Sequence, residues 1–274
     1  MTPAPANDRA FAGAIPAFYD RFMVPLLFAP FADDLAARVA AARPKRVLEV
    51  AAGTGVLTRR LSQVLPEGTT IVATDLAPPM LEEAQRIGTA RPVRWQAADA
   101  QALPFDDASF DVVACQFGAM FFPDKVGAFA QARRVLRTPG LFVFSVWDAL
   151  AHNDFARAVE EALATLFPHD PPRFMSRTPH GYHDPGLVRE HLAGAGFTDV
   201  DVQTVTLTGQ APSAHDVALA LCQGTPLRGE ILARDAARLD EVTDACAQWV
   251  ARRLGDAPAT GRLQAHVVQA WRRG

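Results

Sequence analysis

Residues 46–58 read R-V-L-E-V-A-A-G-T-G-V-L-T and carry the clearest indication of the fold. A short apolar run that contains one acid, Glu49, meets a Gly-Thr-Gly turn and continues with helical spacing. This pattern predicts a buried strand, a tight turn and a helix, which is the first unit of an open α/β sheet. Gly53 and Gly55 have no Cβ, so the backbone can approach a ligand closely, and the helix that follows offers free N–H groups. The turn is therefore either a plain strand-to-helix corner or a nucleotide-like ligand site.

Outward from this unit, apolar strands alternate with helical patterns. Strands that are apolar on both faces and separated by helices predict a mostly parallel sheet covered on both sides, and right-handed crossovers make it doubly wound. We expect seven strands, at 47–50, 70–74, 93–96, 110–116, 141–147, 200–207 and 263–271.

The sheet pattern is interrupted after Trp147, which predicts helical insertions that form a lid. We divide the chain into an N-terminal helical segment that is part of the lid, a cofactor-binding core, a first insertion, a core helix and strand, a second helical insertion and a final core strand. Their ranges are 1–44, 45–148, 149–183, 184–210, 211–258 and 259–274.

Composition excludes several classes of function. The 274 residues have a net charge of -3 and a hydrophobic share of 49%, which suits a full-sized core and does not favour nucleic acid as a partner. Cys115, Cys222 and Cys246 are too few for a disulfide framework, so we expect free thiols in a reducing cytoplasm. The first ten residues show no signal peptide, and prolines break the apolar stretch 22–31, so we expect no membrane span.

Two further acids follow neighbouring strands and extend the interpretation of the turn. Asp75, in I-V-A-T-D-L, is placed to accept hydrogen bonds from ribose hydroxyls, and Asp99, in Q-A-A-D-A, from the exocyclic amine of a base. A nicotinamide fingerprint, G-x-G-x-x-G, would require glycine where the chain has Thr58. The three strand ends together predict a nucleoside pocket with little phosphate chemistry.

Three stretches carry a family resemblance: E-V-A-A-G-T-G (49–55), T-D-L-A-P-P-M-L (74–81) and A-D-A-Q-A-L-P-F-D-D-A-S-F-D-V-V (98–113). They resemble class I S-adenosylmethionine-dependent methyltransferases, which have a Rossmann-like fold. They are most similar to the ubiquinone/menaquinone-type subgroup, methyltransferase domain 11-like, of small-molecule enzymes. The likeness covers roughly residues 45–148, with 184–207 fitting the same fold. The family's first glycine is replaced by Ala51.

The resemblance implies S-adenosyl-L-methionine as cofactor and S-adenosyl-L-homocysteine as product. It implies that the turn holds the methionyl end, Asp75 the ribose and Asp99 the adenine, with an aromatic residue, Tyr19, folded over the cofactor. Glu49 either acts through water or is held only by local hydrogen bonds. The residues implied for the cofactor are Tyr19, Glu49, Ala51, Gly53, Thr54, Gly55, Asp75, Leu76, Met80, Asp99, Ala100 and Gln116.

The acceptor side is less constrained by the sequence. Methyl transfer by in-line displacement needs positioning, no metal, and a general base only if the acceptor must lose a proton. The catalytic residue is unknown; candidates are His183, Asp148 and His152. Residues that could contact the substrate, each of which could instead pack or be solvated, are Phe117, Phe121, Trp147, Tyr182 and Arg228.

Other interpretations stay open at this point. His169, His180, His183 and His191 are too loosely spaced to predict a metal site. We expect a small-molecule methyltransferase, monomeric or homodimeric, with a small-molecule substrate. A NAD-type oxidoreductase and a catalytically idle cofactor-binding module are the alternatives.

Overall fold

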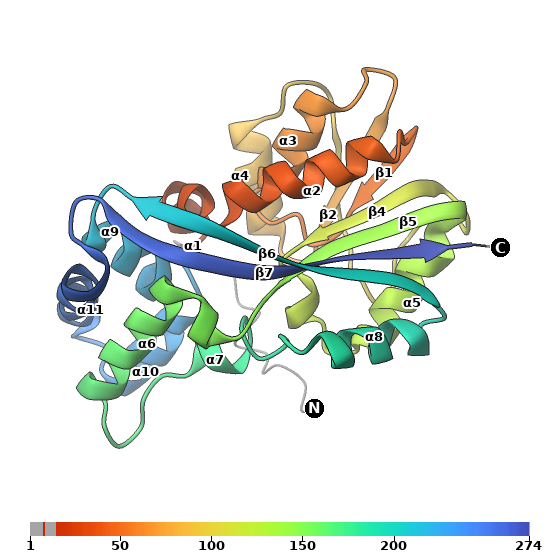
Figure 1. The fold of residues 1–274 in the computed structure, drawn as a ribbon. Helices are drawn as coiled ribbons and strands as arrows, with labels where there is room; N and C mark the ends of the chain where they lie inside the picture. The colour runs from red at the N-terminus through yellow and green to blue at the C-terminus, as the bar shows by residue number, and fades with distance from the viewer. Residues whose placement is uncertain (1–7, 9–14, 274) are drawn as a thin grey trace.

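A seven-stranded mixed sheet runs through the centre of the molecule in the order β3-β2-β1-β4-β5-β7-β6 (Figure 1). The computed structural model describes Asp8 and residues 15–273, so the prediction about a signal peptide and part of segment 1–44 lie outside the described residues. The strands are β1 (Arg46–Glu49), β2 (Thr70–Asp75), β3 (Arg94–Ala97), β4 (Phe110–Gln116), β5 (Leu136–Trp147), β6 (Asp199–Ala211) and β7 (Ala259–Arg272).

Strand pairing confirms the predicted fold class. β1 pairs in parallel with both β2 and β4, β2 with β3, and β4 with β5, whereas β7 runs antiparallel between β5 and β6. The strand order reverses at β1 and β4, where an open α/β sheet binds its ligands beyond the carboxyl ends of the strands. The turn that follows β1 lies at this point.

Three strands are longer than the sequence pattern predicts. β5 begins at Leu136, which pairs with Phe110 of β4, and not at residue 141. β6 and β7 continue their ladder to the pair Ala211–Ala259, beyond the expected ends of both strands. The extra residues pair only with each other, and their alternating or polar side chains gave no continuous apolar signal.

Helices cover the two faces of the sheet and gather at one end of it. In Figure 1, α2 and α3 lie on one face, and α5 and α8 on the other. Near residue 20 the chain forms a π-helix that contains Pro25, where the sequence had suggested only a broken apolar stretch. The helices outside the lid are α1 (Ile15–Phe18), η2 (Tyr19–Phe28), α2 (Ala29–Ala41), α3 (Val56–Val64), α4 (Pro78–Ile87), η3 (Ala119–Phe121), α5 (Lys125–Val135) and α8 (Pro185–Gly194).

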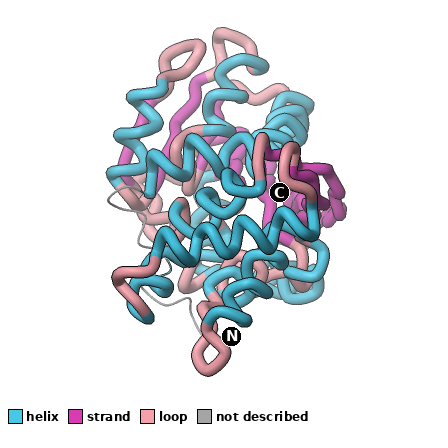
Figure 2. The backbone as a smooth tube through the Cα atoms, turned by 90° about the vertical axis from the view of Figure 1, so that its left-hand side faces the viewer, coloured by secondary structure: helices cyan, strands magenta, loops and turns pink. Residues whose placement is uncertain are grey.

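The helices of the two insertions form a separate layer beside the long β6–β7 pair. Figure 2 shows this layer from its own side, with the strands behind it. The long helix α11 packs on α6, α9 and α10, and apolar side chains from all of these helices join the main core cluster. They are η4 (Leu150–His152), α6 (Asp154–Leu166), α7 (Phe174–Arg177), α9 (Ala214–Ala218), η5 (Leu219–Gln223), α10 (Leu227–Arg234) and α11 (Leu239–Leu254).

In the described part of the chain, every helix is too short or too polar to cross a lipid bilayer.

Candidate functional site

A cavity opens beyond the carboxyl ends of β1, β2 and β4, with about 970 Å³ of empty space, part of it open to solvent. This volume suits a ligand of nucleoside size or somewhat larger. Nine of the twelve residues predicted for the cofactor line it, namely Tyr19, Ala51, Gly53, Asp75, Leu76, Met80, Asp99, Ala100 and Gln116.

The turn after β1 owes its shape to left-handed backbone at three positions. Ala51, Gly53 and Gly55 have φ values of 54°, 57° and 84°, a region that costs little only for glycine. The N–H of Gly53 donates to Asp75 Oδ2 at 2.8 Å, so the turn after β1 is tied to the end of β2. Thr54 and Gly55 do not line the cavity; the Thr54 hydroxyl instead donates to Asp20 Oδ1 at 2.9 Å.

Asp75 and Asp99 both have their carboxylates fixed by backbone N–H groups. Asp75 Oδ1 accepts from Ala77 N at 2.8 Å, and Asp99 Oδ1 accepts from Gln101 N at 2.9 Å. Burial raises the pKa of the Asp75 carboxyl, and its backbone hydrogen bonds work against that rise. Each carboxylate oxygen accepts more than one hydrogen bond, so both acids can still take donors from a ligand in the cavity.

Gln116, at the end of β4, presents an unsatisfied acceptor. Its Nε2 donates to the Phe28 carbonyl at 2.7 Å, whereas its buried Oε1 has no hydrogen-bond partner among the described residues. Because Gln116 lines the cavity and an unpaired buried acceptor costs about 1–3 kcal/mol, a ligand that donates to Oε1 would be stabilised there.

Glu49 lies behind the turn and does not line the cavity. Its Oε2 accepts from the Thr58 hydroxyl at 2.5 Å, so the residue that replaces a fingerprint glycine serves as a partner of this acid. Burial raises the pKa of Glu49 to about 8, against the lowering effects of Thr58 and Arg59. Of the two roles left open by the sequence, the geometry favours a local one.

We expect Glu49→Gln to flatten the dependence of stability on pH. The pKa of Glu49 rises from 4.5 to about 8 on folding, so between these values the folded state binds more protons than the unfolded state. Its contribution to stability is therefore full below about pH 4.5 and is lost as pH rises to about 8, at roughly 1 kcal/mol per pH unit. Glutamine keeps an acceptor for Thr58 but does not titrate.

Urea unfolding at about pH 5 and about pH 8 measures this difference. The exposed Glu67 provides the control, because Glu67→Gln should leave the slope of the native protein in place. An equal slope in Glu49→Gln and the native protein would contradict the assignment.

A second cavity, with about 620 Å³ of empty space, adjoins the first. Tyr19, Phe117 and Phe121 line both cavities. The Phe117 and Trp147 rings stack with centroids 3.9 Å apart and form one aromatic wall. The other walls come from η2, α6, α7 and η5, and include Met23, Leu27, Phe28, Ala156, Phe174, Met175 and Leu221.

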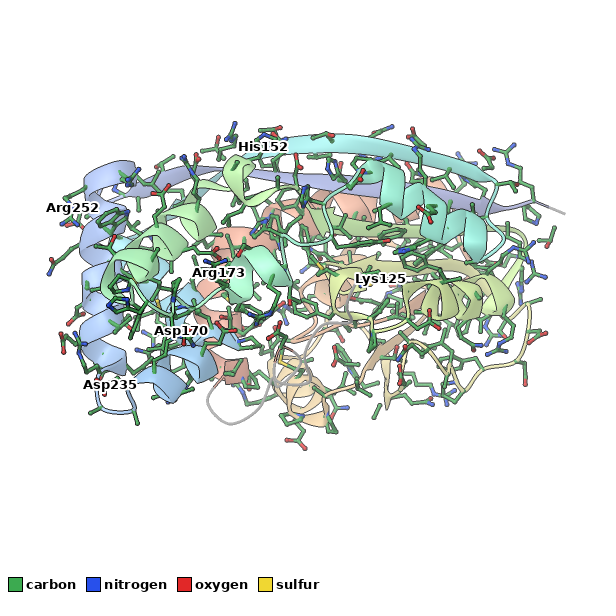
Figure 3. The ribbon with its side chains drawn as sticks, turned by 90° about the horizontal axis from the view of Figure 1, so that it is seen from below. Lys125, His152, Asp170, Arg173, Asp235 and Arg252 are labelled. Atoms are coloured by element: carbon green, nitrogen blue, oxygen red, sulfur yellow. The ribbon has the colours of Figure 1, made fainter. Side chains whose placement is uncertain are left out.

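The structure separates the predicted acceptor residues into two groups. Phe117, Phe121 and Trp147 line the second cavity, whereas Tyr182 and Arg228 line neither cavity. Tyr182 is buried in the core, where its hydroxyl lies 2.9 Å from His191 Nδ1 and its ring faces the ammonium of Lys125. Figure 3 shows Lys125 inside the molecule at the start of α5.

None of the three catalytic candidates lines either cavity. The Asp148 carboxylate contacts His152 Nδ1 at 2.9 Å, Gln264 Nε2 at 2.5 Å and His266 Nε2 at 3.2 Å. Burial opposes ionisation of Asp148, but these contacts and the Ala149 N–H prevail and lower its pKa to about 2.

The two candidate histidines face away from the cavities as well. His152 lies at the outer edge beside β6 and β7 (Figure 3), and His183 Nδ1 bonds to the His180 carbonyl at 2.7 Å. All three candidates therefore serve local structure in this arrangement.

His180 is the polar residue of the second cavity that the sequence did not single out. It lines the cavity from the segment after α7, next to Pro179. The sequence contained no signal for it beyond its position in a segment rich in proline and histidine. In the described ranges, Asp8 and 15–273, no three His, Cys, Asp or Glu side chains gather in a way that could hold a metal ion.

Known proteins resemble the chain over the same region. A family model described as a methyltransferase domain matches residues 48–144. A demethylmenaquinone methyltransferase from Thermus thermophilus is 45% identical over 166 residues, which cover 57% of this chain and 75% of that protein. A malonyl-[acyl-carrier protein] O-methyltransferase from Geobacter sulfurreducens is 34% identical over 160 residues, which cover 58% of each protein.

The chain therefore spans three quarters of the first relative but less than two thirds of the second. Among solved structures, phosphoethanolamine N-methyltransferase 2 from Haemonchus contortus, in complex with phosphomonomethylethanolamine and S-adenosylhomocysteine, is similar with a TM-score of 0.59. The sequence identity is 15%, and the match covers 97% of this chain and 60% of the other. This likeness concerns the fold.

Proposed function

Because the chain belongs to the S-adenosylmethionine-dependent methyltransferases, we propose that it transfers a methyl group to an apolar small molecule in the second cavity. The cofactor, S-adenosylmethionine, supplies an electrophilic methyl group on a sulfonium. The finer assignments below concern what the residues of this chain do.

We propose that the first cavity holds the cofactor. The acceptors at its edge suit a nucleoside: Asp75 would accept from the ribose hydroxyls, Asp99 from the adenine amine, and Gln116 Oε1 from another donor of the cofactor. Leu76, which is 56% exposed, and the buried Met80 would provide apolar contact to the base. An exposed leucine is unusual, and burial under a ligand would stabilise it.

The observation that carries the proposal is the wall shared by the two cavities. A methyl donor in the first cavity and an acceptor in the second would meet at Tyr19, Phe117 and Phe121. In-line transfer depends on alignment of the two reactants, and such positioning contributes about 7–11 kcal/mol to lowering a barrier. The apolar second cavity also limits access of water to the reacting groups.

The acceptor class is proposed from the second cavity, since the relatives differ in the acceptors their names state, demethylmenaquinone and a malonyl-acyl carrier protein. The aromatic and aliphatic lining favours a small apolar molecule. The net charge of -3 does not favour nucleic acid. We also propose a reducing cytoplasm as the place of action, since all three cysteines are free and buried.

Calorimetry with S-adenosylmethionine, S-adenosylhomocysteine and NAD tests the cofactor site, and mass spectrometry after incubation with apolar phenols, amines and thiols tests transfer. We expect binding of both sulfur nucleosides, no binding of NAD, and an increase in acceptor mass by one methyl group. Cofactor binding without methylation of any acceptor in the panel would count against the proposed activity, and NAD binding without binding of the sulfur nucleosides would overturn the cofactor site.

A further inference from the structure

The His180 imidazole lies in the second cavity with one nitrogen anchored. Its Nδ1 is 2.8 Å from the Asp148 carbonyl oxygen, and a carbonyl can only accept, so Nδ1 carries the hydrogen. The neutral ring therefore has its lone pair on Nε2. No described residue forms a hydrogen bond with Nε2, and the ring lines the cavity beside Trp147, with centroids 6.0 Å apart.

The other polar side chains of this cavity have protein partners. The Thr225 hydroxyl donates to the Leu221 carbonyl at 2.7 Å and accepts from Leu227 N at 3.1 Å. The Asn153 amide group donates to backbone carbonyls, and its Oδ1 accepts from Gln264 N at 3.0 Å. Tyr19, at the shared wall, also has a partner. Within the described part of the chain, Nε2 of His180 is thus the acceptor in this cavity that remains for a ligand.

The backbone around His180 is held from several directions. The N–H of His180 donates to the Met175 carbonyl at 2.9 Å, and its carbonyl bonds to His183 Nδ1 at 2.7 Å. Asp8, which is 2% exposed, forms hydrogen bonds with Arg177 and Thr178 just before it. A ring fixed by its own hydrogen bond and by such a backbone can direct Nε2 at one point of the cavity.

We propose that His180 Nε2 accepts the hydrogen bond of a hydroxyl group on the methyl acceptor and takes its proton during transfer. The acceptor class is therefore an apolar phenol, and the product is its methyl ether. This inference rests on the proposed function, because it assigns the substrate class and the base of that same site.

The proposed step balances without a further reactant. The phenol oxygen forms a bond to the methyl carbon as the bond from that carbon to sulfur breaks, and the electron pair stays on sulfur. The hydroxyl proton moves to Nε2, which leaves the ether, S-adenosylhomocysteine and an imidazolium. The imidazolium then returns its proton to solvent.

The protonation state of His180 agrees with this role. Burial lowers the pKa of its imidazole to about 4, against the raising effect of the Asp148 carbonyl, so the ring is neutral at pH 7. His183 and Asp148 are the other titratable groups that act on it. A neutral imidazole tolerates a sulfonium nearby, and it can accept this proton because a hydroxyl oxygen that is gaining a methyl group becomes far more acidic than an imidazolium.

Binding of 4-propylphenol and of propylbenzene to the protein with S-adenosylhomocysteine tests the contact without any turnover. The apolar walls alone would favour propylbenzene, so a preference for the phenol of roughly three- to tenfold is expected only if an acceptor meets its hydroxyl. An absence of preference in the native protein would overturn the proposal, and this result does not depend on any variant.

Two variants then separate binding from proton transfer. In His180→Asn the amide can keep the hydrogen bond to the Asp148 carbonyl but leaves nothing at the position of Nε2; the preference for the phenol should disappear and methylation should fall by about 10²–10⁴-fold. In His180→Gln the amide oxygen can replace Nε2 as an acceptor but cannot take the proton; the preference should remain, with the same fall in methylation.

The exposed His215 of α9 gives the matched control, since His215→Asn should change neither quantity. Affinity for S-adenosylhomocysteine should stay native in every variant, because His180 does not line the first cavity. Full methylation of 4-propylphenol by His180→Asn would overturn the role as a base. Phenol preference that depends on His180, in a protein that methylates no acceptor, would instead reject the proposed function and leave the contact standing.

Discussion

Replacing Asp75 by alanine is expected to weaken the binding of S-adenosylhomocysteine by about ten- to a hundredfold. A hydrogen bond to a charged acceptor contributes about 1.5–3 kcal/mol, and the variant loses the carboxylate proposed to bind the ribose. It also releases the N–H of Gly53, which donates to Asp75 Oδ2 at 2.8 Å, and so loosens the turn after β1. Both effects act on the same ligand.

Calorimetry against S-adenosylhomocysteine measures the loss, and thermal unfolding checks that the variant is folded. Asp106 is a suitable control, because it is an exposed acid outside the cavity and Asp106→Ala should bind as the native protein does. Native affinity in a folded Asp75→Ala protein would remove Asp75 from the cofactor site.

The parallel half of the fold could be predicted because its signals are local. Each strand from β1 to β4 is a short apolar run bounded by a turn, and the predicted range 110–116 agrees with β4 at both ends. The ends of β5, β6 and β7 were less predictable. Their outer residues are held by ladder partners far along the chain, such as Ala211 with Ala259, and such partners leave no pattern in the local sequence.

The same distinction applies to the candidate site. Residues that follow a strand directly, such as Asp75 and Asp99, have positions fixed by the sheet, so their convergence could be predicted. The second cavity is built from η2, α6, α7 and η5, whose arrangement depends on tertiary packing. Nothing in the sequence distinguishes His180 from His183, because the difference is a hydrogen bond to the carbonyl of Asp148, more than thirty residues away.

Gly118 shows how the turn after β1 tolerates Ala51 in place of the family's first glycine. A Cβ on Gly118 would lie 2.5 Å from Ala51 Cβ and 2.9 Å from Cys115 Sγ. The methyl group of Ala51 therefore occupies the space that a side chain at 118 would need. The φ of Gly118, -101°, is open to any residue, so the need for glycine there is one of space and not of backbone conformation.

We therefore expect Gly118→Ala to destabilise the protein by about 1–3 kcal/mol, the usual cost of forcing extra volume into a packed region. Ala51 is fixed to a strained backbone at φ 54° and cannot simply turn aside. The turn itself must move, so the affinity for S-adenosylhomocysteine should fall together with the stability. Urea unfolding and calorimetry on the same samples measure the two effects.

A second substitution distinguishes this steric account from a general loss of packing. Ala51→Gly removes the methyl group and suits the left-handed backbone, so Gly118→Ala with Ala51→Gly should recover most of the stability and of the affinity. Gly229, whose added Cβ would meet nothing within 4 Å, is the control, and Gly229→Ala should be neutral or slightly stabilising. Additive losses in the double variant would show that Ala51 and Gly118 do not share the space, and the cofactor turn would then need another explanation for its alanine.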